Sequence, residues 1–169
     1  MGNGDETLLK RIAAGEPPAM QDLHAAYADR LFRYALLRTR DRQLAEDVVQ
    51  ETLLAVWRSA SAYRGASSVS TWLFGICRHK VADALRRCPA TETRPLPEAI
   101  PRDGGEPAVE FWETFDRLET DDRELLLLVF HYGFSQQEVA QIMDVPVGTV
   151  KSRTYYARRR LQALLEGGS

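Results

Sequence analysis

The sequence predicts an all-α protein built from two small helical domains that a flexible, proline-rich linker joins. Apolar residues recur at helical spacing along most of the chain, and no segment sustains the alternation typical of a strand. Five of the eight prolines fall within 88–108, where they remove backbone donors and oppose a packed helix. Near the C-terminus, a tight turn followed by a basic helix is typical of a helix-turn-helix.

The chain has 169 residues, of which 44% are hydrophobic and 27% are charged. This composition is ordinary for a soluble globular protein that buries real cores. Residues 1–16 are polar, so we expect no secretory leader. The longest aliphatic or aromatic run, 125–130, is far too short to span a bilayer. We therefore expect a cytoplasmic protein without membrane insertion.

Nothing in the sequence indicates catalysis, a metal or a cofactor. The three histidines are scattered, and no zinc-protease helix, phosphate loop or nucleophile elbow occurs. Two cysteines are too few for a structural zinc site. Cys77 lies on an apolar helical stripe, which predicts a buried thiol, whereas Cys88 at a helix end is expected to be more exposed. A regulatory disulfide is the alternative, although a reducing compartment disfavours it.

The formal net charge of −2 by itself argues against nucleic-acid binding, but the distribution of charged residues along the chain reverses that conclusion. Residues 20–87 carry 11 basic and 7 acidic side chains, and residues 146–169 carry 5 basic and 1 acidic. Between them, residues 109–145 carry 2 basic and 9 acidic side chains. Two basic regions on an acidic background predict two separate footprints for a polyanion.

The first half of the chain predicts four helices. One covers about 6–14 and ends at Gly15. The others cover about 20–39, 41–61 with Asp41 as N-cap, and the stretch to residue 87 that follows a Gly/Ser-rich loop. The inward positions of the last three helices are Leu23, Tyr27, Leu31, Tyr34 and Ala35, then Leu44, Val48, Val56 and Trp57, then Leu73, Cys77, Val81 and Ala84.

The second half predicts helices near 109–118 and 121–132, the latter stopped by Gly133, and then the helix-turn-helix. Ser135 and Glu138 have the spacing of a capping box, which marks the start of the first helix of the pair. Pro146 suits the first position of the second helix, because its missing N–H is not needed there. The buried face of the first helix comprises Val139, Ala140, Ile142 and Met143.

At 100° per residue, one stripe of the last helix is apolar and the opposite face is small and polar, then cationic. The stripe comprises Val150, Thr154, Ala157, Leu161 and Leu164. The outward and flanking positions that suit DNA are Gly148, Thr149, Lys151, Ser152, Arg153, Tyr155, Tyr156, Arg159 and Arg160. The alternative is an amphipathic terminal helix whose arginines are simply solvated.

Several motifs in order give the chain a more specific resemblance. They are DVVQET at 47–52, followed by Trp57, YRGASS at 63–68, STWL at 70–73, DALRR at 83–87, GTVKSR at 148–153 and ARR at 157–159. Over residues 17–165 the chain resembles bacterial sigma factors of the extracytoplasmic-function group in the sigma-70 family. This resemblance implies four segments: an N-terminal extension (1–16), a region 2 domain (17–87), a linker (88–108) and a region 4 domain (109–169).

The resemblance implies that the chain binds core RNA polymerase and directs it to promoters. The residues that would contact the clamp coiled coil of the largest subunit are Asp47, Gln50, Glu51 and Leu54, which share one helical face. Without the family context, this face reads as a solvated one. The residues that would recognise and melt the −10 element are Tyr63, Arg64, Ser67, Ser68, Trp72, Arg78, His79, Lys80, Arg86 and Arg87. For Trp72 the residues themselves favour a core position, and stacking on a base is the alternative.

By the same resemblance, the Gly148 to Arg160 positions named above read the −35 element. The polymerase flap and an anti-sigma protein are further implied partners, and the active protein is expected on the nucleoid. Val69, Cys77, His79 and Tyr156 depart from the usual family pattern. The competing class is a helix-turn-helix regulator that acts without polymerase, which would not need the Asp47 to Glu51 face or the Ser/Gly loop.

Overall fold

The computed structural model describes residues 2–88 and 109–167, and every secondary-structure element in these two ranges is helical. This confirms the predicted all-α class. The chain divides into two compact units, residues 1–100 and 101–169. Of the predicted linker, residues 89–108 lie outside the described residues. No helix in the described ranges is long and apolar enough to cross a membrane.

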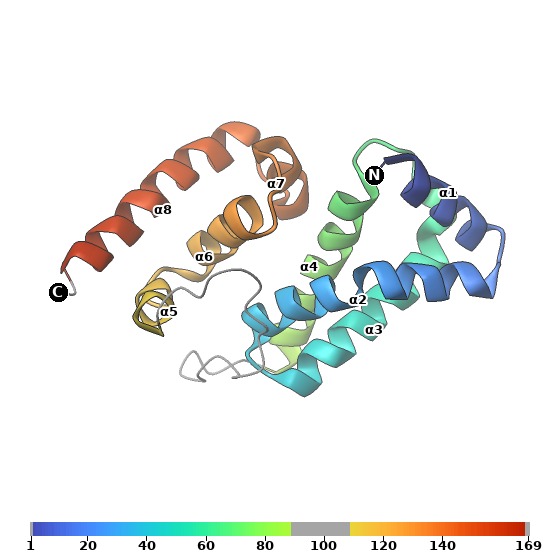
Figure 1. The fold of residues 1–169 in the computed structure, drawn as a ribbon, viewed down its shortest axis with the longest axis horizontal. Coiled ribbons are helices and arrows are strands. Elements are labelled where there is room, and N and C mark those ends of the chain that lie inside the picture. Colours follow the sequence, from blue (N-terminus) through green and yellow to red (C-terminus); the bar gives the residue numbers. More distant parts are fainter. Residues whose placement is uncertain (1, 89–108, 168–169) are drawn as a thin grey trace. The chain divides into compact units, whose positions relative to one another are not determined.

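The first unit is a bundle in which α2 packs against α3 and α4, and α3 packs against α4 (Figure 1). Its elements are α1 (Gly2–Ala13), α2 (Pro17–Thr39), α3 (Arg42–Ser59), the 3-10 turn η1 (Ala60–Ala62) and α4 (Val69–Arg87). Asp41 caps α3 as predicted, and its Oδ1 accepts a hydrogen bond from the Leu44 amide at 3.0 Å. Helix α2 begins three residues earlier than expected, because its prolines occupy the first turn, where no backbone donor is needed.

The core of this unit follows the predicted stripes with one exception. The rings of Tyr34 and Phe74 meet at 5.5 Å, and the Cys77 thiol is fully buried. Leu44 is half-buried. Trp57, however, was expected to face inward and is 40% exposed. Trp57 follows the buried Val56 and therefore points about 100° away from it around α3. This direction lies just outside the side of α3 that packs against α2 and α4.

Helix α1 is an integral part of the first unit. Leu9 and Ile12 are buried, and α1 contacts α2, α3 and η1. The hydroxyl of the buried Tyr27 donates a hydrogen bond to Asp5 Oδ2 at 2.6 Å, which ties the start of α1 to α2. The helix predicted at about 6–14 therefore forms, and it begins earlier, at Gly2.

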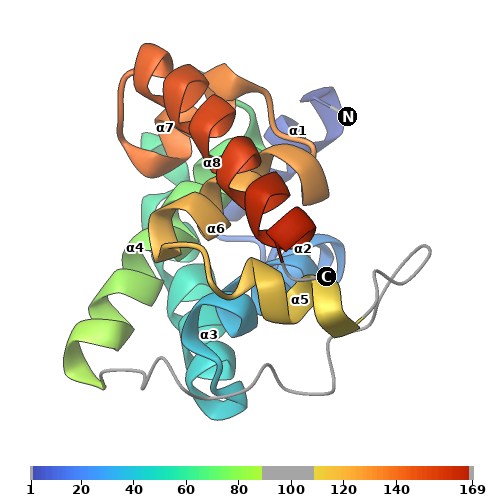
Figure 2. The same ribbon diagram turned by 90° about the vertical axis from the view of Figure 1, so that its left-hand side faces the viewer.

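The second unit packs α8 against α5, α6 and α7, and the same contacts are visible in both views (Figures 1 and 2). Its elements are α5 (Val109–Phe115), α6 (Thr120–Leu126), the π-helical turn η2 (Leu127–His131), α7 (Gln136–Met143) and α8 (Val147–Gly167). The sequence predicts one regular helix over 121–132, but its second half winds as a π-helix and ends before Gly133, whose φ is +72°.

Candidate functional site

The helix-turn-helix forms as its local chemistry predicts. Ser135 Oγ accepts from the Glu138 amide at 3.1 Å, and the Glu138 carboxylate accepts from the Ser135 amide at 2.7 Å. Asp144 ends α7 in the left-handed conformation with φ 55°. The Pro146 carbonyl accepts from the amides of Thr149 and Val150, so α8 begins at Val147, one residue later than expected. The turn is short and held by the backbone at both ends.

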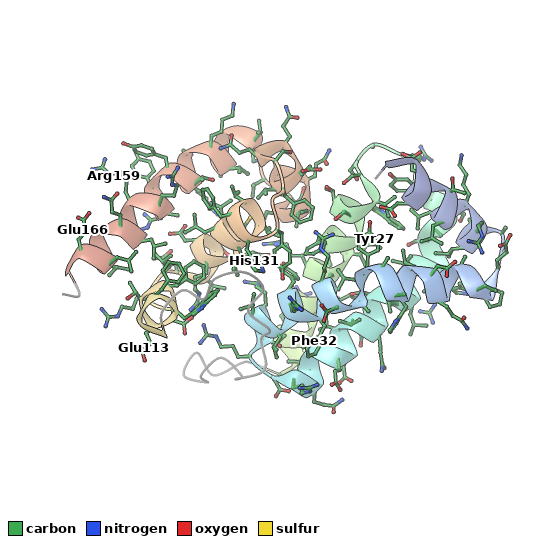
Figure 3. All side chains as sticks on the ribbon, in the orientation of Figure 1. Tyr27, Phe32, Glu113, His131, Arg159 and Glu166 are labelled. Carbon is green, nitrogen blue, oxygen red and sulfur yellow. The ribbon has the colours of Figure 1, made fainter. Side chains whose placement is uncertain are left out.

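Helix α8 divides into the two faces that its sequence predicts. Val150, Thr154 and Ala157 are buried, and Leu161 and Leu164 are half-buried. The opposite face is exposed, and Figure 3 shows Arg159 on the side of α8 that faces away from α6. The predicted DNA positions on this side are therefore accessible within the unit.

The arginines of α8 differ in what they contact. Arg153 lies 3.8 Å from Asp121, and Arg160 pairs with the buried Asp122, both at the start of α6. Arg159 instead donates to the Tyr155 hydroxyl at 3.2 Å and lies over the ring of that residue. Two of the predicted phosphate contacts thus have carboxylate partners inside the unit.

The loop before α4 is closed by hydrogen bonds from its own predicted site residues. The Tyr63 hydroxyl donates to the Ser67 carbonyl at 2.5 Å, and Gly65 takes a positive φ of 74°. Ser68 caps α4, because its Oγ accepts from the Thr71 amide at 3.1 Å. Tyr63 and Ser68 therefore shape the loop whatever else they bind.

Two aromatic rings and two carboxylates surround this loop. The Tyr63 and Trp72 rings meet at 5.3 Å, and both side chains are half-buried, so Trp72 is neither a core residue nor a free platform. Burial raises the pKa of the Tyr63 hydroxyl, and the charges of Glu6 and Asp5 raise it further. Helix α1 thus places negative charge beside the candidate base-binding loop.

The predicted basic residues of α4 do not form one cluster. At 100° per residue, His79, Arg86 and Arg87 lie on the face of Trp72 and are exposed. Arg78 and Lys80 lie at opposite edges of the buried stripe, and both are half-buried. The helix has 19 residues and is about 28 Å long, so Arg86 and Arg87 lie far from the loop. Arg86 pairs with Asp83, and Arg87 lies 3.5 Å from Glu51 on α3.

The predicted polymerase-binding residues form one outward face of α3. Asp47, Gln50 and Leu54 are exposed, and Glu51 is half-exposed. Leu54 is 52% exposed at the centre of this face. The exposed Trp57 extends this face by one turn. An apolar centre with a carboxylate rim is the composition of a protein-binding surface.

The second unit contains an apolar groove that was not predicted from the sequence. Its volume is about 500 Å³ and its lining is mostly apolar. The lining residues are Phe111, Trp112, Phe115, Leu126, Leu127, Phe130, His131, Arg158, Leu161, Gln162 and Leu165. Three aromatic residues within one short helix, at 111, 112 and 115, were the available signal. The π-helical turn, which leaves Phe130 58% exposed, had none.

A second groove, of about 520 Å³, lies between α2 and α3 and includes Phe32, Val49 and Gln50, so it adjoins the outward face of α3.

In the described ranges, no group of three or more His, Cys, Asp or Glu side chains is placed to hold a metal ion. Cys88 is exposed and Cys77 is buried, as predicted, and neither forms a disulfide.

Both units match family models. Residues 23–88 match Sigma-70 region 2, and residues 108–161 match Sigma-70, region 4. Among curated proteins, the chain is 33% identical to the ECF RNA polymerase sigma factor SigM of Mycobacterium tuberculosis, over 95% of this chain and 84% of the relative. It is 32% identical to SigL of the same species, over 91% of this chain and 93% of the relative.

Solved structures give the same result. The chain superposes on CnrH, solved in complex with the cytosolic domain of CnrY, with a TM-score of 0.75 and 26% identity, covering 99% of this chain and all of that one. For the sigma factor RpoE of Bartonella quintana, solved with the anti-sigma factor NepR, the TM-score is 0.72 at 27% identity, covering 86% and 96%. The match to region 2 disfavours a regulator that works without polymerase. The chain therefore belongs to the sigma-70 family, as an extracytoplasmic-function sigma factor that gives RNA polymerase its promoter specificity in transcription initiation.

Proposed function

We propose that the two units divide the work, with residues 17–87 binding core polymerase and opening the −10 element, and residues 109–169 reading the −35 element. In this scheme the chain carries no catalytic residue, metal or cofactor, and RNA synthesis belongs to the polymerase. The protein acts in the cytoplasm and on the nucleoid when active.

The outward face of α3 would bind the clamp coiled coil of the largest polymerase subunit. Support comes from the exposed Leu54 at the centre of a helix that is otherwise packed on its apolar side. Glu51 lies one turn and Asp47 two turns from Leu54, and both would pair with a basic partner surface. Because Glu51 already lies near Arg87, binding would exchange one exposed ion pair for others, at little net cost.

The loop 63–68 would hold a base that leaves the −10 duplex. The positive φ of Gly65 and the small side chains at 66–68 leave room beside the loop for a base. The Ser67 hydroxyl would bind that base, because the Ser67 carbonyl and the Ser68 hydroxyl already make hydrogen bonds within the loop. His79 lies farther along the same face of α4, with the half-buried Lys80 at the edge of that face, and both would contact the phosphates of the opened strand. Arg86 and Arg87 would act at the opposite end of that face.

Helix α8 would enter the major groove of the −35 element. Its first turn carries Gly148 and Ser152, which permit close approach to base edges, and the later turns carry cationic side chains for base edges and phosphates. The apolar groove of the second unit would receive the polymerase flap. The two structural relatives are complexes with CnrY and with an anti-sigma factor, and we propose that an anti-sigma protein likewise controls this chain.

The observation that carries the proposal is the exposed, acid-rimmed face of α3, and charge reversal tests it. Asp47→Lys with Glu51→Lys should weaken binding of the full chain to core polymerase by at least tenfold, while circular dichroism and thermal unfolding stay unchanged. Glu16→Lys with Glu119→Lys gives the same change in net charge at exposed positions away from both proposed polymerase contacts and is the matched control. Equal affinity for both double variants would refute the interface.

A further inference from the structure

Two tyrosines and one arginine form a cluster on the outward face of α8. Tyr155 and Tyr156 are each 56% exposed, and their ring centroids lie 5.3 Å apart at 81°. Arg159 lies one turn farther along, and in projection around the helix it falls between the two rings. We refer to Tyr155, Tyr156 and Arg159 as the aromatic–arginine cluster.

The cluster does not contribute to the core. Exposed aromatic side chains of this size, side by side on a helix, are depleted from ordinary solvated surfaces and enriched where a protein binds a partner. The buried residues of α8 lie on the other side of the helix, at Val150, Thr154 and Ala157. The fold therefore gives no reason for two tyrosines at these positions.

Tyr155 restrains the guanidinium of Arg159. Its hydroxyl accepts a hydrogen bond from Arg159 Nη1 at 3.2 Å, and the guanidinium carbon lies 5.7 Å from the ring centroid. An arginine loses rotamer freedom when it binds, so holding it beforehand lowers that entropic cost. The bidentate hydrogen bonds of arginine to guanine O6 and N7 depend on such orientation.

Tyr156 offers something different, because its ring lies on the flank of the same face with an apolar edge exposed. In the major groove the only methyl group belongs to thymine, and apolar contact with it distinguishes thymine from the other bases. Tyr156 and Arg159 are three residues apart on the helix, so they would reach neighbouring base pairs.

We propose that the aromatic–arginine cluster sets the sequence preference of α8: Tyr155 positions Arg159 for a guanine, and Tyr156 contacts the methyl group of an adjacent thymine. The proposal rests on the assignment of α8 to the −35 element. Tyr155 is a positioning residue in this scheme, whereas Arg159 and Tyr156 contact the bases.

Two measurements test the cluster, both with holoenzyme assembled from the full chain and core polymerase. The −35 region of a transcribed promoter is first randomised, and the bound sequences are recovered. Each thymine of the preferred duplex is then replaced by deoxyuridine, which removes only the methyl group. We expect one such replacement to weaken binding about three- to fivefold, and to have no effect on Tyr156→Ala.

For Arg159, the test is discrimination between the preferred guanine and adenine at one position. Arg159→Ala should abolish it, and Tyr155→Phe, which keeps the ring but loses the hydroxyl, should reduce it about threefold. In the Arg159→Ala background, Tyr155→Phe should have no further effect, as expected of a residue that acts through another. Glu166→Gln alters an exposed side chain in the last turn of α8, outside the lining of the apolar groove, and should leave both preferences unchanged.

The outcomes distinguish a failure of the cluster proposal from a failure of the assignment of α8 to the −35 element. If holoenzyme recovers no preferred −35 sequence, the assignment of α8 to that element fails. If it recovers one, but no deoxyuridine effect depends on Tyr156, or Tyr155→Phe acts equally with and without Arg159, the cluster proposal is overturned while the assignment stands.

Discussion

At the scale of single residues, Gly148 occupies a position where folding and the proposed DNA binding favour different residues. A Cβ at this position would meet no atom within 4 Å, and its φ lies outside the left-handed region. Glycine in a helix is less stable than alanine by about 0.5–1 kcal/mol. The fold alone would therefore favour alanine, and close approach to base edges is the remaining reason for glycine.

We expect Gly148→Ala to stabilise the protein by up to about 1 kcal/mol and to weaken duplex −35 binding severalfold. Urea unfolding followed by circular dichroism and fluorescence anisotropy with labelled duplex measure the two effects. Gly75→Ala is a matched control, because a Cβ there also meets nothing within 4 Å but lies on α4. Undiminished affinity in Gly148→Ala would remove the close-approach argument.

Tyr27 links the stability of the first unit to pH. Burial raises the pKa of its hydroxyl, and the hydrogen bond to Asp5 raises it further. A folded-state pKa above the unfolded value of about 10 means that the neutral form stabilises the fold. That contribution is complete below about pH 10 and is lost as the pH rises through the folded-state pKa.

Tyr27→Phe should therefore lower the free energy of unfolding at pH 8 by about 1–2 kcal/mol and flatten its decline between pH 8 and pH 11. Urea titrations at several pH values give both quantities. Tyr156→Phe, at an exposed position of the other unit, should leave the profile unchanged. A wild-type profile that stays level above pH 10 would contradict the linkage.

At the scale of elements, the helix starts at Asp41 and Ser135 were predictable because a cap depends only on residues three positions apart. The exposure of Trp57 was not predictable from its position in the sequence, because it depends on how much of the α3 surface is covered by α2 and α4. The π-helical turn at Leu127–His131 likewise has no local signature. Local side-chain chemistry determines where a helix begins, whereas the exposure of a side chain at the edge of an apolar stripe depends on the packing of neighbouring helices.

The acidic start of α6 would compete with DNA for the arginines of α8 if these bind DNA as we propose. Asp121 lies 3.8 Å from Arg153, and both side chains are largely exposed, so their pairing is worth little in water. Next to a duplex, the Asp121 carboxylate would repel phosphates and keep Arg153 from pairing with one. The short segment at Asp121 and Asp122 would thus limit binding to arbitrary DNA.

Asp121→Asn should tighten binding to a non-promoter duplex about two- to fivefold at low salt. The slope of log K against log salt concentration should steepen by an amount equivalent to less than one released counterion. Anisotropy titrations from 50 to 200 mM salt provide the slope. Asp116→Asn removes the same charge at a residue paired with Arg123 on α6 rather than with α8, and should change neither quantity. If both variants tighten binding equally, general charge rather than the Arg153 pairing is responsible.

At the scale of the whole molecule, segment charges predicted more than the net charge did. The two basic segments fall in different units, with the most acidic stretch forming α5 to α7 of the second. The order of the motifs predicted which unit would bind which partner. The sequence could not predict that Arg86 and Arg87 lie a full helix length from the loop at 63–68, because residues on one helical face can still be remote along its axis.

This division of labour predicts that defects in the two units respond differently to promoter opening. Arg64 is exposed in the loop of the first unit, and Arg159 is exposed on α8 of the second. On a double-stranded promoter, we expect Arg64→Ala and Arg159→Ala each to reduce transcription by holoenzyme about tenfold or more. On a template with a preformed bubble at −10, the cost of unstacking is already removed, so Arg64→Ala should recover most of its activity. Arg159→Ala should recover little, because the −35 duplex is the same in both templates. Equal recovery of the two variants would mean that the units do not act on separate DNA structures.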